Sequence, residues 1–375
     1  MLIAVVFSGI FFSFFSTITV SPISLLLNNG LIMSEVNGNM ILLARESRGW
    51  TQAQLAGKMD TTQSNITKME HAEHGTNEEW TAKIAEATGY PLSFFYQKGG
   101  IIPENLNYRR REKVAQSILS PLNAQMTIYR LQIETITAAL NIPAIQLPVL
   151  EVTEEATPQA IAQKLLQKWH VPKGSVANLT DIIEGHGIVV NMFDFGTARV
   201  DSRCLISENG IPIIFMNSSL LGDRQRFSLA YQLGHLIMHT SSNISWDRDT
   251  GHEANLFAAE LLMPEKDIRA DFEQGISLPL LGNLKKKWKV SMIALLYRAD
   301  DLGYVTPQQK KALVQQFNDR QIRRREPVEL DVPLEQPRLL RQWLSQLKSE
   351  RRMNTSELAA MLHLQANEFV ALYNY

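Results

Sequence analysis

The sequence predicts an α+β protein that is mainly helical and contains one small β-sheet. Apolar residues recur at helical spacing along most of the chain, which predicts helices. Three short runs, "GIVVNMF", "RCLISE" and "IPIIFMN", have the apolar, β-branched composition of strands. Because 375 residues exceed what one hydrophobic core usually organises, we expect several domains: an N-terminal helical bundle, a sheet-containing domain and a helical C-terminal region.

The overall composition is that of an ordinary globular protein and gives no general attraction to polyanions. Hydrophobic residues make up 45% and charged residues 20%, with a formal net charge of -1. Any contact with nucleic acid must therefore come from a local surface. The single cysteine, Cys204, excludes an internal disulfide and a thiolate zinc cage. A reducing, cytoplasmic location fits this usage.

The first 32 residues form an apolar leader, and the first charged residue is Glu35. Residues 2–20 are long enough to cross a bilayer. However, no Lys or Arg precedes Arg45, and both secretory signals and oriented membrane anchors need flanking positive charge. We favour a translation start at Met33 or Met40, with a membrane anchor as the alternative.

Residues 33–100 are predicted to fold as a helix-turn-helix bundle. Thr51, with a glutamine three residues later, forms a capping box, so a helix should begin at Gln52. Thr62 is the expected N-cap of a further helix over residues 63–70. Two short helices joined by so tight a turn are typical of a helix-turn-helix, and another helix is expected near residues 80–88.

The exposed face of the helix over residues 63–70 carries side chains that can pair with base edges and contact phosphate. Such residues are also common on any solvated helix, so composition alone leaves both interpretations open. The residues expected to bind DNA are Gln52, Thr62, Gln63, Ser64, Asn65, Thr67 and Lys68.

The segment resembles the Xre/Cro-like helix-turn-helix of phage repressors and antitoxins. The family pattern R-x-x-x-G-x-T-Q-x-x-L-A is met by Arg45, Gly49, Thr51, Gln52, Leu55 and Ala56. The resemblance implies that the helix beginning at Gln63 enters the major groove and that Gln52 touches backbone phosphate. It also implies a homodimer on a palindromic operator, with half-sites about 34 Å apart.

Residues 101–150 are expected to form a helical connector, since residues 104–140 have helical texture. A basic run from Arg109 to Arg111, followed by Lys113, is either a solvated face or an extension of the phosphate-binding surface. Prolines then break the chain before the next domain begins.

The domain over residues 151–317 is expected to place the small sheet beside the helix that contains "RFSLAYQLGHLIMH", residues 226–239. A helix over "EANLFAAELLMP" should cover it and end at Pro264. A zincin carries two histidines at i and i+4, with a glutamate after the first that activates water. Here the corresponding residues are Tyr231, Gln232 and His235.

Neither Tyr231 nor Gln232 can replace the missing groups. A phenol has a reference pKa of about 10, so its ligating anion is scarce at neutral pH. An amide has no basic oxygen, and loss of a general base typically lowers a rate by about 10² to 10⁴. We therefore expect no catalytic residue in this domain.

A residual metal site is the alternative, with His235, His239 and Glu253 as candidate ligands. Leu236 follows His235, so no adjacent carboxylate could act on bound water, and such a site would be structural. A hydrogen-bonded core histidine and a carboxylate that favours the helix dipole are the preferred interpretations. No cofactor is expected, and residual zinc remains the alternative.

The segments "DRQRFSLAYQLGHLIMH" and "EANLFAAELLMP" resemble the ImmA/IrrE family of metallopeptidase-like domains, which often follow an Xre-type helix-turn-helix. Active members carry His, Glu and His at the positions of Tyr231, Gln232 and His235, with a later glutamate that corresponds to Glu253. The resemblance implies a zincin-like fold with a degenerate zinc motif.

Residues 318–337 combine basic residues with three prolines and are expected to be a linker. Residues 338–375 repeat the helix-turn-helix pattern without gaps, since "RRMNTSELAAMLHLQANEF" aligns with "RGWTQAQLAGKMDTTQSNI". The second unit has no positive charge at its reading positions, so we expect it to serve packing or dimerisation rather than DNA contact.

These observations favour a sequence-specific DNA-binding regulator with a catalytically inactive peptidase-like sensor or scaffold domain. The alternatives are a zinc-dependent endopeptidase that cleaves a repressor, and a membrane-tethered regulator that uses the leader. A protein partner or a toxin is implied by resemblance alone.

Overall fold

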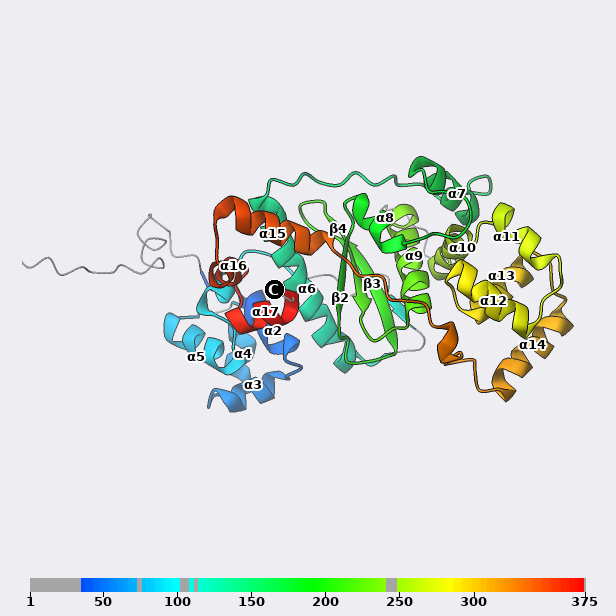
Figure 1. Ribbon diagram of the computed structural model, residues 1–375. Coiled ribbons are helices and arrows are strands. Elements are labelled where there is room, and N and C mark those ends of the chain that lie inside the picture. Colours follow the sequence, from blue (N-terminus) through cyan, green and yellow to red (C-terminus); the bar gives the residue numbers. More distant parts are fainter. Residues whose placement is uncertain (1–34, 73–75, 102–107, 111–113, 241–247, 374–375) are drawn as a thin grey trace, which may run out of the picture.

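The computed structural model describes residues 35–72, 76–101, 108–110, 114–240 and 248–373. Helices gather at both ends of an elongated molecule, and a sheet lies between them (Figure 1). The predicted α+β class is confirmed. The apolar leader lies outside the described residues. Within the described ranges, no helix is both long and apolar enough to cross a membrane.

The N-terminal bundle begins and ends its helices where the sequence predicts. Thr51 forms the expected capping box, and Thr62 caps the next helix. Gly49 takes φ +72°, a backbone conformation that glycine adopts readily, and so ends the first helix. The elements are α2 (Gly38–Ser47), α3 (Gln52–Lys58), α4 (Gln63–Glu70), α5 (Glu78–Thr88) and the 3-10 turn η1 (Leu92–Tyr96).

Among the described residues of the connector, the helical stretch runs from Gln116 to Ala139 and is α6. Tyr108–Arg110 form a short strand, β1, so the prediction of helical texture from residue 104 is wrong for these residues. The physical reason is long-range: β1 pairs antiparallel with β3, which would otherwise be the edge of the sheet.

The sheet has four strands in the order β1-β3-β4-β2. The three predicted strand runs form β2 (Val189–Phe193), β3 (Val200–Ile206) and β4 (Pro212–Asn217). The pair β3–β4 is antiparallel and the pair β2–β4 is parallel.

Alternation along β4 gives the sheet two apolar faces. Ile213 and Phe215 pack with α6, whereas Ile214 and Met216 pack with α9 (Gly222–Met238), because successive strand side chains point to opposite faces. The helix α10 (Thr250–Leu262) covers α9 closely. A Cβ added at Gly234 would lie 2.9 Å from the Phe257 ring, so glycine is what allows this approach. The helices α7 (Pro158–Lys168) and α8 (Leu179–Gly185) complete this core.

The end of the molecule farthest from the N-terminal bundle is formed by α11 (Glu265–Phe272), α12 (Leu278–Trp288), α13 (Met292–Asp301) and α14 (Pro307–Asp319) (Figure 1). From there the chain returns across the molecule through η2 (Val328–Leu330). This return segment is packed against the domain: buried Lys285 binds Glu326 at 2.7 Å and Asp223 at 2.6 Å. A Cβ at Gly222 would lie 2.2 Å from the Val332 carbonyl oxygen.

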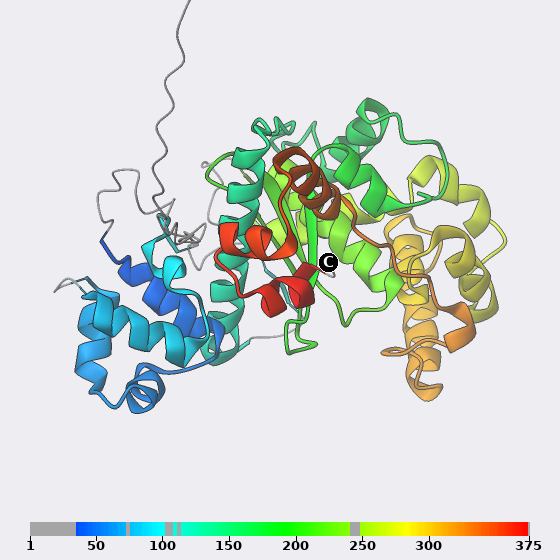
Figure 2. The same cartoon turned by 60° about the vertical axis from the view of Figure 1, so that its left-hand side comes forward.

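The last three helices are α15 (Leu339–Arg351), α16 (Thr355–Met361) and α17 (Ala366–Tyr373). Their backbone repeats that of the N-terminal bundle at a constant offset. Left-handed residues occur at Gly49 and Arg352 and again at Asp60 and His363, and capping boxes open both α3 and α16. This unit packs on α6 beside the N-terminal bundle, as Figure 2 also shows.

Candidate functional site

The helix α4 presents a polar face to solvent. Gln63, Ser64, Asn65 and Lys68 are exposed, while Ile66 is fully buried beneath them. The Asn65 backbone N–H donates to the Thr62 hydroxyl at 3.3 Å, so Thr62 acts at least as the helix cap. The arrangement presents amide and hydroxyl groups to solvent, which is the chemistry needed to read bases, and Asn65 Nδ2 donates to Thr61 Oγ1 at 3.0 Å.

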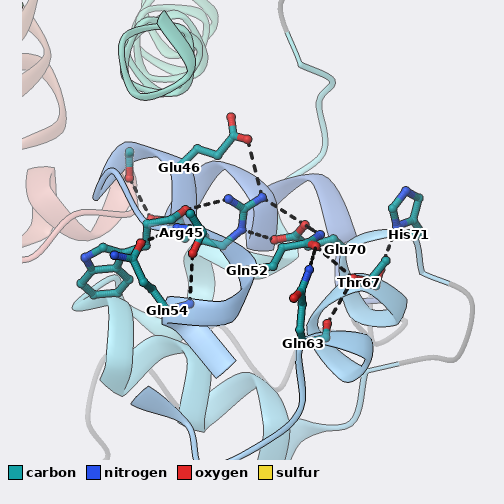
Figure 3. A network of polar contacts seen from close by, with 12 residues as sticks. Arg45, Glu46, Gln52, Gln54, Gln63, Thr67, Glu70 and His71 are labelled. Carbon is teal, nitrogen blue, oxygen red and sulfur yellow. Dashed lines mark hydrogen bonds and ion pairs between the residues drawn. The ribbon is translucent and has the colours of Figure 1, made fainter. Parts of the chain in front are cut away.

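A buried ion pair fixes α4 against α2 (Figure 3). Arg45 Nε donates to Glu70 Oε1 at 2.5 Å and Arg45 Nη2 donates to Glu70 Oε2 at 3.1 Å. The third donor, Arg45 Nη1, binds the Trp50 carbonyl oxygen at 2.8 Å. Because the two side chains are 8% and 1% exposed, water cannot replace either partner.

The same network includes Gln52, at the start of α3 (Figure 3). Gln52 Nε2 donates to Glu70 Oε2 at 2.7 Å, and Gln52 Oε1 accepts from Thr67 Oγ1 at 3.0 Å. Gln63 Nε2 approaches the same oxygen at 3.4 Å. Gln52 and Thr67, both predicted to contact DNA, are thus joined to each other and hold α3 and α4 together.

The sequence reasoning missed Glu70, which is the acceptor at the centre of this network. A signal for it was available, since Glu70 is the acidic residue that ends the polar-faced α4 and Arg45 is a basic residue on the first helix of the same bundle, α2. Burial of both groups required the folded structure.

In the second domain, Tyr231, Gln232 and His235 lie on α9, which crosses one face of the sheet. Gln232 is wholly buried, and its Nε2 donates to Ser202 Oγ on β3 at 2.9 Å. Burial raises the pKa of Tyr231, which makes its phenolate still scarcer. The Gln232 amide is therefore part of the packing between α9 and the sheet.

Arg109 lies against this part of α9. Its guanidinium carbon is 4.6 Å from the centroid of the Tyr231 ring and 4.8 Å from that of the Phe227 ring. Asp201 lies 3.8 Å from Arg109 Nε. A solvated face and a phosphate contact were the two interpretations of the basic run; neither holds for Arg109, because β1 carries it onto α9.

His235, His239 and Glu253, the candidate metal ligands, come together in a line of hydrogen bonds. The Nδ1 atoms of the two histidines are 2.8 Å apart, and His239 Nε2 is 2.7 Å from Glu253 Oε2. Arg248 donates two hydrogen bonds to the same carboxylate. Burial, the His239 ring and Arg109 lower the pKa of His235 to about 3.

Burial also lowers the pKa of His239, so both rings are neutral near pH 7. A neutral His239 that donates through Nε2 to Glu253 accepts through Nδ1 from His235, which leaves His235 Nε2 as a lone pair. That atom is buried without a hydrogen-bond partner in the described structure. Only one ligating atom is thus free, and no group of three or more His, Cys, Asp or Glu residues in the described ranges is arranged to hold a metal ion. The residues do not fit a zinc ion as they stand.

Two protein-family models match the chain, one over the N-terminal bundle and one over the domain that contains the sheet. A helix-turn-helix family model matches residues 41–95, which span α2 to η1. The model of the IrrE N-terminal-like domain matches residues 183–300, which include the sheet, α9 and α10. No curated protein matches the chain. The chain is therefore a fusion of an Xre-like helix-turn-helix, which is a DNA-binding domain, with a peptidase-like domain of the IrrE/ImmA type.

Proposed function

We propose that the protein is a cytoplasmic, sequence-specific transcriptional regulator that reads DNA with α4. The observation that carries this proposal is the exposed polar face of α4 on a helix whose position is fixed by the Arg45–Glu70 pair. A helix held in one place can present Gln63 and Asn65 to base edges without a large ordering cost.

The proposed assembly is a homodimer on a palindromic operator. A single α4 contacts only a few base pairs, and two copies related by a two-fold axis would read half-sites about 34 Å apart. Selection from a random duplex pool should recover an inverted repeat. Recovery of no preferred sequence would refute sequence-specific reading.

Substitution tests the reading face directly. Gln63→Ala and Asn65→Ala should each weaken operator binding by about 1–3 kcal/mol while leaving non-specific binding nearly unchanged. Gln167→Ala and Asn283→Ala, which are exposed helix positions in the other domain, serve as matched controls. Equal affinity for all four variants would remove α4 as the reading element.

For the peptidase-like domain we propose a catalytically silent role as a sensor, a scaffold or a docking surface for a protein partner. The support is that Gln232, at the place of the general base, has its amide committed to Ser202, and that Tyr231 lies beneath a fixed guanidinium. Neither residue supplies a base or a ligand. An antitoxin or prophage role is a narrower form of the same proposal.

Metal analysis of two proteins tests catalytic silence. The parent should contain zinc below stoichiometry after gentle purification and should leave a candidate repressor intact. The Tyr231→His, Gln232→Glu variant would add a second imidazole one turn from the free Nε2 of His235, and Glu253 lies nearby. If this variant binds zinc and the parent does not, the result supports a peptidase-like fold that has lost its metal ligands.

The second candidate function is a zinc endopeptidase that uses His235, His239 and Glu253. Their mutual contact is the observation that favours it. Stoichiometric zinc in the parent together with zinc-dependent cleavage of a candidate repressor, both lost in His239→Gln, would establish this alternative and contradict the silent-domain proposal.

A further inference from the structure

The turn that follows α14 carries three exposed arginines that the proposed function does not use: Arg320, Arg323 and Arg324. No ion pair holds any of the three in the described part of the chain. The next residue behaves differently, because Arg325 pairs with Asp331. Like charges placed so close repel, so a bound anion would relieve the repulsion.

The turn has a fixed conformation. Ile322 N–H donates to the Phe317 carbonyl at 3.0 Å and Gln321, at φ +57°, donates to the Asn318 carbonyl at 2.9 Å, which closes the end of α14. On the other side, Glu326 is buried against Lys285. The arginines are therefore carried on a turn that is fixed at both ends.

The side chains around the turn line an open hollow of about 590 Å³. Its lining residues are Asn318, Gln321, Arg323 and Arg324. Two guanidinium groups and two side-chain amides supply many N–H donors, and no carboxylate is among them. The negative end of the α14 dipole accounts for a cation at Arg320, but Arg323 and Arg324 lie beyond the last turn, where that field falls off.

We propose that this hollow binds phosphate oxygens through Arg323 and Arg324. Planar guanidinium groups bind phosphate through paired N–H donors, which suits a site without a neutralising carboxylate. The ligand class is a phosphate diester or polyphosphate.

The backbone of a DNA duplex is the source that the arrangement favours. The turn after α14 and the helix α3 both lie at the lower edge of the molecule in Figure 1 and in Figure 2, so a duplex along that edge could meet both. The choice of DNA as the ligand rests on the proposed function, whereas the phosphate site itself does not. A free polyphosphate could accept hydrogen bonds from the same guanidinium and amide N–H groups.

The test compares the full chain with its Arg323→Gln, Arg324→Gln variant. The control, Lys164→Gln, Lys168→Gln, removes the same charge from exposed positions on α7, at the opposite edge of the molecule (Figure 1). Binding to a duplex of the selected operator, with and without about two extra helical turns on each side, is measured against salt concentration. Each lost phosphate contact should lower the salt slope by about 0.9 on the long duplex only.

The expected difference in slope of about 1.8 means that, between 50 and 200 mM salt, the parent and the control lose about 12-fold more affinity than the arginine variant. This result supports the site with DNA as its source. Unchanged slopes, together with calorimetric binding of inorganic pyrophosphate that the arginine variant loses, support the site with a free phosphate ligand. Unchanged slopes without pyrophosphate binding overturn the proposal.

Other measurements distinguish failure of the proposed function from failure of the phosphate site. If selection recovers no operator, a non-specific long duplex and pyrophosphate still report on the hollow. Gln63→Ala reports on α4 alone.

Discussion

Glu70→Gln should destabilise the N-terminal bundle, because it removes the buried counter-charge of the Arg45 guanidinium and leaves only the more distant and more exposed Glu46, whose Oε1 lies 3.5 Å from Arg45 Nη2. The two side chains are 8% and 1% exposed, and two of the three hydrogen bonds of Arg45 go to Glu70. Removing one partner of a buried pair costs about 3–5 kcal/mol. Glutamine keeps one acceptor oxygen, so we expect about 3 kcal/mol, the lower end of that range.

Urea unfolding followed by far-UV circular dichroism measures this free energy. Glu79→Gln is the matched control: it removes the same charge from an exposed pair with Lys83, and its unfolding should not differ measurably from that of the parent. Arg45→Met combined with Glu70→Leu should recover most of the loss, since an apolar pair of similar volume needs no counter-charge. If Glu70→Gln unfolds at the same urea concentration as Glu79→Gln, the ion pair does not hold α4 in place.

Three further predictions concern packing and pH. Gly222→Ala should lower the free energy of unfolding by about 3 kcal/mol, the upper end for overpacking, because its Cβ would lie 2.2 Å from the Val332 carbonyl oxygen. Gly57→Ala is the control: its Cβ would meet open space, so it should raise the free energy of unfolding by about 0.5–1 kcal/mol, and thermal unfolding compares the two variants. The His235 pKa is about 3 in the folded protein and has an ordinary value of 6.5, so the unfolded chain binds more protons between these values and stability should fall as pH drops through that window. His235→Gln should make this decline shallower in urea titrations at each pH. Tyr373→Phe should cost about 1–3 kcal/mol, since it removes the buried hydroxyl that donates to Gln132; an unchanged unfolding midpoint would show that this bond does not anchor α17.

Local signals allowed the N-terminal bundle to be predicted from sequence. Caps at Thr51 and Thr62 act within four residues, so the starts of α3 and α4 could be read directly. The three strand runs were equally local. The gapless repeat over residues 338–375 predicted a second helix-turn-helix-like unit, and the capping box that opens α3 recurs at α16.

The remaining features depend on contacts between residues far apart in sequence. Residues 108–110 have no strand signal strong enough to show beside a long helical pattern, and they become a strand only because β3 offers an edge. The partner of Gln232 is Ser202, which lies 30 residues earlier on another element. The zinc motif could be read letter by letter, but the line of hydrogen bonds through His239 depends on how α10 and Arg248 approach.

The shared core of α2, α6 and the C-terminal unit has a consequence for biosynthesis. Phe369 and Leu344 are fully buried in the same cluster as Met40 and Ile41, and Arg48 on the first bundle binds Glu368 on the last helix. The ribosome makes the N-terminal bundle before α15–α17, so the bundle receives these neighbours only after they have been synthesised. A proteolytically shortened polypeptide that lacks α15–α17 would expose apolar surface on α2 and α6, so quality control can distinguish it from the folded protein.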